Sequence, residues 1–204
     1  MKKLFIILLP FLFTGCATLS ENECRVANWQ TIGYNDGSQG YATSRISEHT
    51  SACADYGVRP DLTLYLRGHE EGASAYCTPH NGFDAGRANK AYAGICSQSQ
   101  EPSFMQGYRD GQKVYSAEQE LNNIRHRITT LENDKKKLQK DIDQNQTKII
   151  SNETGMSERA NLLYQNNKLL DRQSHIDHEI GMLKQKEQFQ QNEIRHLMRL
   201  GGRY

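Results

Sequence analysis

Five cysteines supply most of the reactive chemistry in this sequence, and all five lie in its first half. The first, Cys16, follows an apolar stretch of about ten residues that begins behind Lys2 and Lys3. A basic start, a short apolar stretch and a small residue before the cleavage point are typical of a secretory signal. The stretch has about half the length that a membrane-spanning helix needs. The motif Phe13-Thr14-Gly15-Cys16 therefore predicts a lipobox, in which residues 1–15 are removed and the Cys16 thiol is diacylated.

The residues around this motif suggest where the protein is sent. Phe13 stands where Leu is commonest in a lipobox, so an ordinary signal peptide cut nearby is the alternative. Ala17, rather than Asp, follows Cys16, and by resemblance to bacterial lipoprotein sorting this favours the outer membrane over the inner one. We expect a lipid-anchored protein on the outer membrane that faces the periplasm.

The other four cysteines, Cys24, Cys53, Cys77 and Cys96, are an even number in an exported chain, which predicts two disulfides. Zinc is the alternative, because Cys77-Thr78-Pro79-His80 offers a Cys-x-x-His fragment, but the chain lacks a second pair at ligand spacing. If the chain forms two antiparallel helices over 22–40 and 43–56, Cys24 and Cys53 meet at one end of the pair. The bridge Cys77–Cys96 then follows by exclusion, although a straight helical hairpin would place those two residues at opposite ends.

The sequence holds no recognisable catalytic constellation. It contains no nucleophile elbow, phosphate loop, dinucleotide fingerprint or metalloprotease helix, so we predict no catalytic residue, cofactor or metal site. Asp171, His175 and His178 share a helix face that is more often solvated than metal-binding. We interpret Lys135-Lys136-Lys137 with Lys140 in the same way, with contact to anionic headgroups or peptidoglycan as the alternative. Loss of the two signal lysines would change the formal net charge from +1 to −1, so we expect no nucleic-acid partner.

A glycine-aromatic pattern recurs four times in the first half of the chain. The copies are Gly33-Tyr34-Asn35-Asp36-Gly37, Gly68-His69-Glu70-Glu71-Gly72, Gly82-Phe83-Asp84-Ala85-Gly86 and Gly107-Tyr108-Arg109-Asp110-Gly111. The copy at 82–86 keeps only the glycines and the ring, and each of the other three precedes a tyrosine. Glycines four apart share a helix face that another helix can approach closely. Asp-Gly and Asn-Gly are also hairpin-turn dipeptides, but the flanking residues are polar or small. We therefore predict helices over 22–40 and 43–56, and another that starts near Asp61.

Two kinds of side chain in these copies are candidates for function. The acids Asp36, Glu71 and Asp110 recur at one position, where they could gather around a cation. We favour a structural role, such as accepting hydrogen bonds from tyrosine hydroxyls. Aromatic residues in and before the copies could form a stacking surface for sugars: Trp29, Tyr34, Tyr65 and Tyr108.

The pattern changes to heptads after Tyr115. Apolar residues step by three and four in two registers: Leu121, Ile124, Ile128, Leu131, Leu138, Ile142 and Ile149, then Leu162, Leu169, Ile176, Ile180, Leu183, Ile194 and Leu197. A turn signal near 151–157 separates them. Arms of similar length favour an antiparallel hairpin within one chain, and a parallel homodimer of one continuous helix is the alternative.

The first half resembles a known group of proteins. The sequence resembles a family of Gram-negative lipoproteins known only as a domain of unknown function. The features that carry this resemblance are a lipobox, Cys24 and the motif Trp29-x-x-Ile32-Gly33-Tyr34-x-Asp36-Gly37. Further matching residues are Pro60-Asp61, Tyr65-x-x-Gly68, Tyr76-Cys77 and Gly94-x-Cys96. The resemblance covers about residues 20–115 and implies a domain without implying a mechanism.

The sequence thus predicts a mainly α protein with four parts. These are a signal peptide (1–15), a lipid anchor with a short linker (16–23), a small disulfide-stapled helical head of glycine-aromatic repeats (24–113) and a coiled-coil hairpin (114–204). We expect a structural, tethering or adaptor role in the cell envelope, without enzymatic activity, through contacts with an envelope protein or peptidoglycan. The alternative function is a peptidoglycan- or sugar-binding module that uses the aromatic residues of the head.

Overall fold

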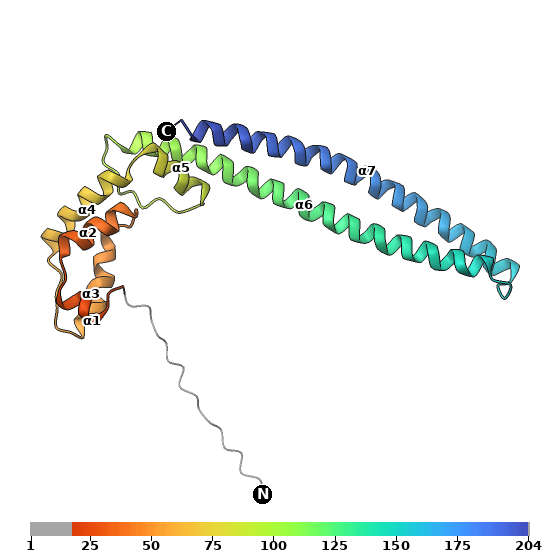
Figure 1. Ribbon diagram of the computed structural model, residues 1–204, viewed down its shortest axis with the longest axis horizontal. Coiled ribbons are helices and arrows are strands. Elements are labelled where there is room, and N and C mark those ends of the chain that lie inside the picture. Colours follow the sequence, from red (N-terminus) through yellow and green to blue (C-terminus); the bar gives the residue numbers. More distant parts are fainter. Residues whose placement is uncertain (1–17, 204) are drawn as a thin grey trace, which may run out of the picture. The chain divides into compact units, whose positions relative to one another are not determined.

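The computed structural model describes residues 18–203, and all regular elements in that range are helices. The predicted signal peptide and Cys16 lie outside the described residues. The chain forms the helices shown in Figure 1: α1 (Glu21–Arg25), α2 (Trp29–Ser38), the 3₁₀ helix η1 (Thr43–Arg45), α3 (Ile46–Ala54), α4 (Leu62–Tyr76), α5 (Pro79–Arg87), α6 (Glu101–Ile150) and α7 (Met156–Gly201). The predicted mainly α fold is confirmed.

Contacts group the described chain into two compact units. The first unit contains residues 18–78 and 92–102, and the second contains residues 79–91 and 103–203. The last two glycine copies therefore belong to the unit that also holds the long helices.

Capping residues explain where the short helices begin. Asp61 accepts a hydrogen bond from the amide of Leu64, which caps α4 at the predicted residue. Pro79 opens α5, where its missing N–H costs nothing. The prediction of one helix over 22–40 was wrong, because the Asn28 side chain accepts from the amide of Thr31 and starts α2 separately from α1.

In the first unit, α2 and α4 lie backbone to backbone. A Cβ atom on Gly33 would lie 2.0 Å from the carbonyl oxygen of Tyr65, and one on Gly68 would lie 1.9 Å from that of Gln30. Gly37 and Gly72 repeat these contacts one turn further along both helices, so α2 and α4 run in the same direction. The helical interpretation of the glycine copies is confirmed, and the hairpin-turn interpretation was wrong.

The second unit repeats this pairing with α5 and the start of α6. Gly82 approaches the carbonyl of Phe104, and Gly107 approaches that of Pro79. In both pairs, each glycine approaches a carbonyl group three positions before the corresponding glycine of the partner helix. Gly33, for example, approaches Tyr65, which lies three positions before Gly68. The four copies therefore form two parallel helix pairs with one shared register.

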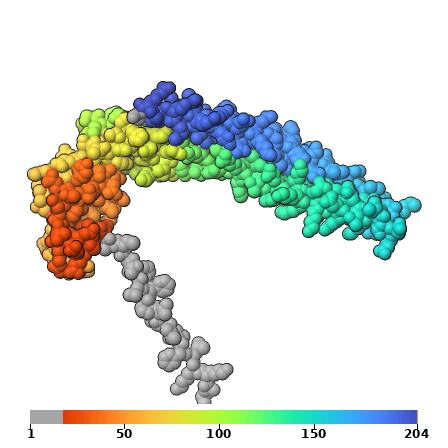
Figure 2. Space-filling view, in the orientation of Figure 1, coloured from red at the N-terminus to blue at the C-terminus, as the bar shows by residue number. Residues whose placement is uncertain are grey.

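The rest of the second unit is an antiparallel hairpin of α6 and α7. In Figure 2 the green-to-cyan surface of α6 lies alongside the blue surface of α7. The helices contain 50 and 46 residues, which correspond to about 75 and 69 Å at 1.5 Å per residue. Apolar seam residues such as Ile124, Leu138 and Ile176 are buried. Five ion pairs join the two helices: Arg125–Glu187, Arg127–Glu179, Lys135–Asp177, Lys184–Glu132 and Lys186–Glu120. The hairpin prediction is confirmed.

Candidate functional site

The first unit has a polar cluster at its centre. Asp36 Oδ2 accepts hydrogen bonds from the Tyr65 hydroxyl at 2.7 Å and from His49 Nε2 at 2.8 Å. The exposed fractions are 6% for Asp36, 3% for His49 and 0% for Tyr65. Arg45 Nε lies 3.2 Å from Asp36 Oδ1 and supplies the balancing charge. One carboxylate therefore joins α2, α3 and α4, which confirms the structural role expected for this acid.

Burial raises the pKa of the Tyr65 phenol well above its ordinary value, and the hydrogen bond to Asp36 raises it further. The phenol therefore stays protonated and remains a donor to Asp36 throughout the neutral range. The other two acids of the repeat have different partners, because Glu71 accepts from Gln30 and Asp110 pairs with Lys113. The three acids do not form one cation site.

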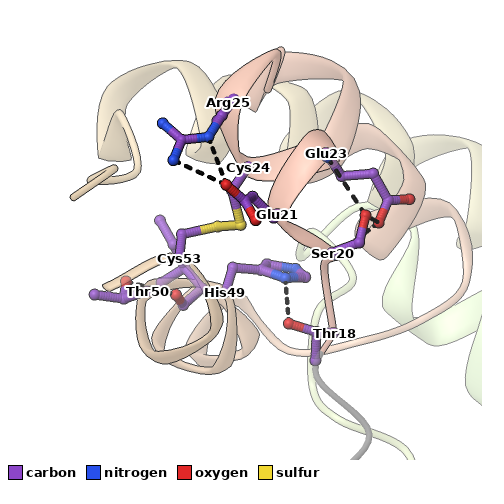
Figure 3. The surroundings of a disulfide bond; sticks show 10 residues. Thr18, Ser20, Glu21, Glu23, Cys24, Arg25, His49, Thr50 and Cys53 are labelled. Atoms are coloured by element: carbon purple, nitrogen blue, oxygen red, sulfur yellow. Dashed lines mark hydrogen bonds and ion pairs between the residues drawn. A yellow bond between two sulfur atoms is a disulfide. The ribbon is translucent and has the colours of Figure 1, made fainter. Parts of the chain in front are cut away.

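The same cluster holds the N-terminal end of the described chain. His49 Nδ1 lies 2.8 Å from Thr18 Oγ1, as Figure 3 shows. Because the Asp36 carboxylate is an acceptor, it places a ring proton on Nε2, and Nδ1 shares a hydrogen bond with the Thr18 hydroxyl. A hydroxyl, an imidazole and a carboxylate occur in this order in nucleophilic triads. Here, however, the imidazole is almost fully buried and bridges two segments of the fold, which is a structural arrangement.

The residues after Thr18 are also fixed. Leu19 packs against a core cluster that contains Trp29 and the Cys24–Cys53 disulfide. The Ser20 side chain accepts from the Glu23 amide, and the Glu23 carboxylate accepts from the Ser20 amide, which forms a capping box at the start of α1. These hydrogen bonds from Ser20 lower the pKa of Glu23. The chain is therefore attached to the core of the unit from its first described residue onward.

The first unit also carries an open groove of about 750 Å³. Its lining comes from α4, from residues 42–43 and from the segment 93–100. His69 lies in this lining with 4% of its surface exposed, and its Nε2 donates to the carbonyl oxygen of Tyr41 at 2.7 Å. Glu70, the next residue, is exposed and also lines the groove.

Cross-links fix the far wall of this groove. The Cys77–Cys96 disulfide joins the end of α4 to the segment 93–100, with 5.5 Å between the Cα atoms. The Gln100 side chain donates to the carbonyl oxygen of Ser74 at 3.0 Å. The Tyr92 hydroxyl accepts from the Cys96 amide, and burial raises the pKa of this phenol. The groove is therefore built from covalent and hydrogen-bonded parts.

Both predicted disulfides, Cys24–Cys53 and Cys77–Cys96, are present. The second forms because the chain after α5 is irregular and returns to the end of α4, whereas a straight helical hairpin would have kept the two cysteines apart. Cys77 therefore has no free thiolate for the zinc alternative. Asp171 and His175 are exposed on α7, and no group of metal-ligating side chains occurs within residues 18–203.

The expected aromatic surface was wrong for two of its four residues. Trp29 and Tyr65 are 7% and 0% exposed, because their rings fill the core around the Cys24–Cys53 disulfide. Tyr34 is 43% exposed. Tyr108 belongs to the second unit, where its hydroxyl donates to the carbonyl oxygen of Lys90 at 2.7 Å. What the sequence missed was the groove, whose His69 and Glu70 look like ordinary members of a glycine copy.

None of the described helices combines the length and the apolar character needed to cross a membrane. No curated protein and no solved structure matches the chain. A family model does match, over residues 28–113, which span all four glycine copies. The matching family is described as "Protein of unknown function (DUF2799)".

Proposed function

We propose that this protein is an outer-membrane lipoprotein with a structural, tethering or adaptor role in the cell envelope. Cys16 carries the lipid, the disulfide-bonded unit sits at the membrane surface, and the hairpin offers a long surface for contact with an envelope protein or peptidoglycan. The two disulfides support a location outside the cytoplasm.

The observation that carries this proposal is the attachment of Thr18 to His49. Only Ala17 separates Thr18 from Cys16 in the sequence. Two residues of extended chain span at most about 7 Å. A lipid on Cys16 would therefore hold the first unit directly against the bilayer, rather than at the end of a flexible linker.

The hairpin supports the tethering part of the proposal. Its five interhelical ion pairs are exposed, and each such pair contributes at most about 1 kcal/mol. Buried seam residues therefore supply most of its stability and leave long polar faces for other contacts. Because α6 runs unbroken from the last glycine copy into the hairpin, one helix links the family domain to this surface.

In-cell photo-crosslinking tests the adaptor role. A photoreactive amino acid replaces Lys136 or Gln185, two exposed hairpin residues, one at a time in the full chain. We expect a discrete crosslinked product from at least one position, which mass spectrometry assigns to an envelope protein or to peptidoglycan. The matched control places the same probe at Thr63, an exposed residue of α4 outside the hairpin. Products from Thr63 alone would contradict a role for the hairpin.

A further inference from the structure

We infer that the groove beside α4 binds an extended peptide segment that carries a lysine side chain. The inference deepens the adaptor role proposed above by naming the chemistry of the partner. Its test is independent of that role, because the groove lies wholly within the first unit and needs neither the lipid nor the hairpin.

The charge of the groove points to a cationic ligand. Glu70 is the charged residue of its lining, and no lysine or arginine lines it. The Glu70 carboxylate forms no hydrogen bond or ion pair with any residue between 18 and 203. A carboxylate without a partner beside an uncharged surface attracts an ammonium group and repels an anion.

His69 adds a second acceptor. Its Nε2 carries the proton that it donates to the carbonyl oxygen of Tyr41, which leaves Nδ1 as the ring nitrogen that can accept. No donor in the described part of the chain bonds to this nitrogen. The ring that carries this nitrogen lines the groove. A donor bound in the groove would complete the pairing.

The apolar part of the groove suits the rest of a lysine side chain. Leu66, Ala73 and Ile95 contribute apolar surface to the lining. A lysine stem packs along such surface while its ammonium group reaches a carboxylate at the edge. The groove thus offers both halves of a lysine-binding site, with Glu70 as the acceptor for the charge.

The far wall of the groove, which the segment 93–100 forms, favours a peptide as the ligand. The backbone groups of Ala93, Gly94 and Ile95 form no hydrogen bond with other described residues. Peptides in an extended conformation bind to such free backbone groups through their own amides and carbonyls. The adjacent Cys77–Cys96 disulfide holds this wall in place, which reduces the entropy lost on binding.

Nuclear magnetic resonance titration of the ¹⁵N-labelled full chain in detergent micelles tests the inference. The probe is the peptide acetyl-Gly-Lys-Gly-amide, and the readout is the shift of the Gly94 amide signal. We expect saturable shifts with this peptide, no saturable shift with the same peptide carrying norleucine in place of lysine, and weaker binding of 1-aminopentane, which has the ammonium group but no backbone.

Variants identify the site. Glu70→Gln removes the acceptor charge, and we expect about 1.5-fold to fivefold weaker binding of the lysine peptide, the range for an exposed ion pair. The matched control is Glu71→Gln on the same helix, because Glu71 pairs with Gln30 outside the groove, and we expect unchanged binding. Absence of binding to the unmodified chain, or equal binding by the Glu70→Gln variant, would overturn the inference. Equal affinity for 1-aminopentane would overturn the assignment to a peptide.

Discussion

Thr18 Oγ1 and His49 Nδ1 are separated by 2.8 Å, and this hydrogen bond attaches the start of the described chain to the buried Asp36 carboxylate through one imidazole. Since only Ala17 lies between Thr18 and the predicted lipidation site, the contact determines how freely the first unit could move relative to a lipid on Cys16.

Replacement of Thr18 by Val should lower the free energy of unfolding of the first unit by about 1 kcal/mol, because His49 Nδ1 loses its hydrogen-bond partner. Thr18→Ser keeps the hydroxyl and should unfold at nearly the same urea concentration as the unmodified chain. Trp29 is the single tryptophan of the chain and lies in the core of this unit, so its fluorescence follows this unfolding step. Equal urea midpoints for the Val and Ser variants would show that the hydrogen bond contributes nothing.

Gly68→Ala should destabilise the first unit by at least about 2 kcal/mol, because an added Cβ would lie 1.9 Å from the Gln30 carbonyl oxygen and would force α2 and α4 apart. The control is Gly181→Ala in the interior of α7, where the added carbon would have no atom within 4 Å other than the adjacent backbone of α7 itself. That change should stabilise the hairpin by about 1 kcal/mol through helix propensity. Thermal unfolding followed by circular dichroism measures both effects, and a neutral Gly68→Ala variant would contradict the close helix packing.

Much of the fold could be predicted from local sequence signals. Asp61 and Pro79 have side-chain and backbone chemistry that starts a helix, and the heptads on either side of a central turn favour a hairpin over a continuous helix. The partners of the glycine helices could not be predicted, because glycines four apart mark a helix face without naming the helix that packs on it. The parallel pairing of α2 with α4 and of α5 with α6 depends on the whole tertiary arrangement.

The candidate sites were harder to predict for a related reason. His49 lies among polar residues of α3, and nothing in its neighbours indicates that it is buried between Thr18 and Asp36. Trp29 and Tyr65 have the side chains of a sugar-stacking surface, but large rings beside a disulfide gain more by filling a small core. The groove depends on an irregular segment, 93–100, whose position is set by the Cys77–Cys96 bridge rather than by periodicity.

The first unit should lose stability at alkaline pH because of Tyr65. Its phenol has a pKa in the folded state that is raised above the ordinary value of 10.0 by burial and by Asp36. The raised pKa therefore stabilises the folded state fully below pH 10. Above pH 10 the phenol of the unfolded chain ionises first, so the free energy of unfolding falls by up to about 1.4 kcal/mol per pH unit. Urea unfolding followed by Trp29 fluorescence at pH 9 and pH 11 measures this loss.

Tyr65→Phe provides the comparison for that pH effect. The variant should be less stable at pH 9, since Asp36 loses a donor, and its stability should fall less between pH 9 and pH 11. Tyr34→Phe, at an exposed residue of the neighbouring helix, is the matched control and should follow the unmodified chain. An identical alkaline loss in the Tyr65→Phe variant would assign the effect to another group.

A buried polar contact across the seam of the hairpin can be tested directly. Asn145 Nδ2 donates to Asn166 Oδ1 at 3.0 Å, and Asn166 is 6% exposed. Asn166→Leu alone should destabilise the hairpin by about 1 kcal/mol or more, because Asn145 keeps a polar group without this partner. The double variant with leucine at both positions should be more stable than the single one, since two apolar groups then meet. Thermal unfolding followed by circular dichroism compares the three chains, and a double variant less stable than the single one would contradict this pairing.

The proposed position of the first unit at the membrane requires a lipid on Cys16, and the intact mass of the protein purified from cell membranes tests this lipid most directly. We predict a chain that begins at Cys16, lacks residues 1–15 and carries the added mass of a diacylglyceryl group. Cys16→Ser should abolish that added mass. A mature chain cut at another residue, with an unmodified Cys16 thiol, would contradict the anchor and the proposed position of the first unit at the membrane.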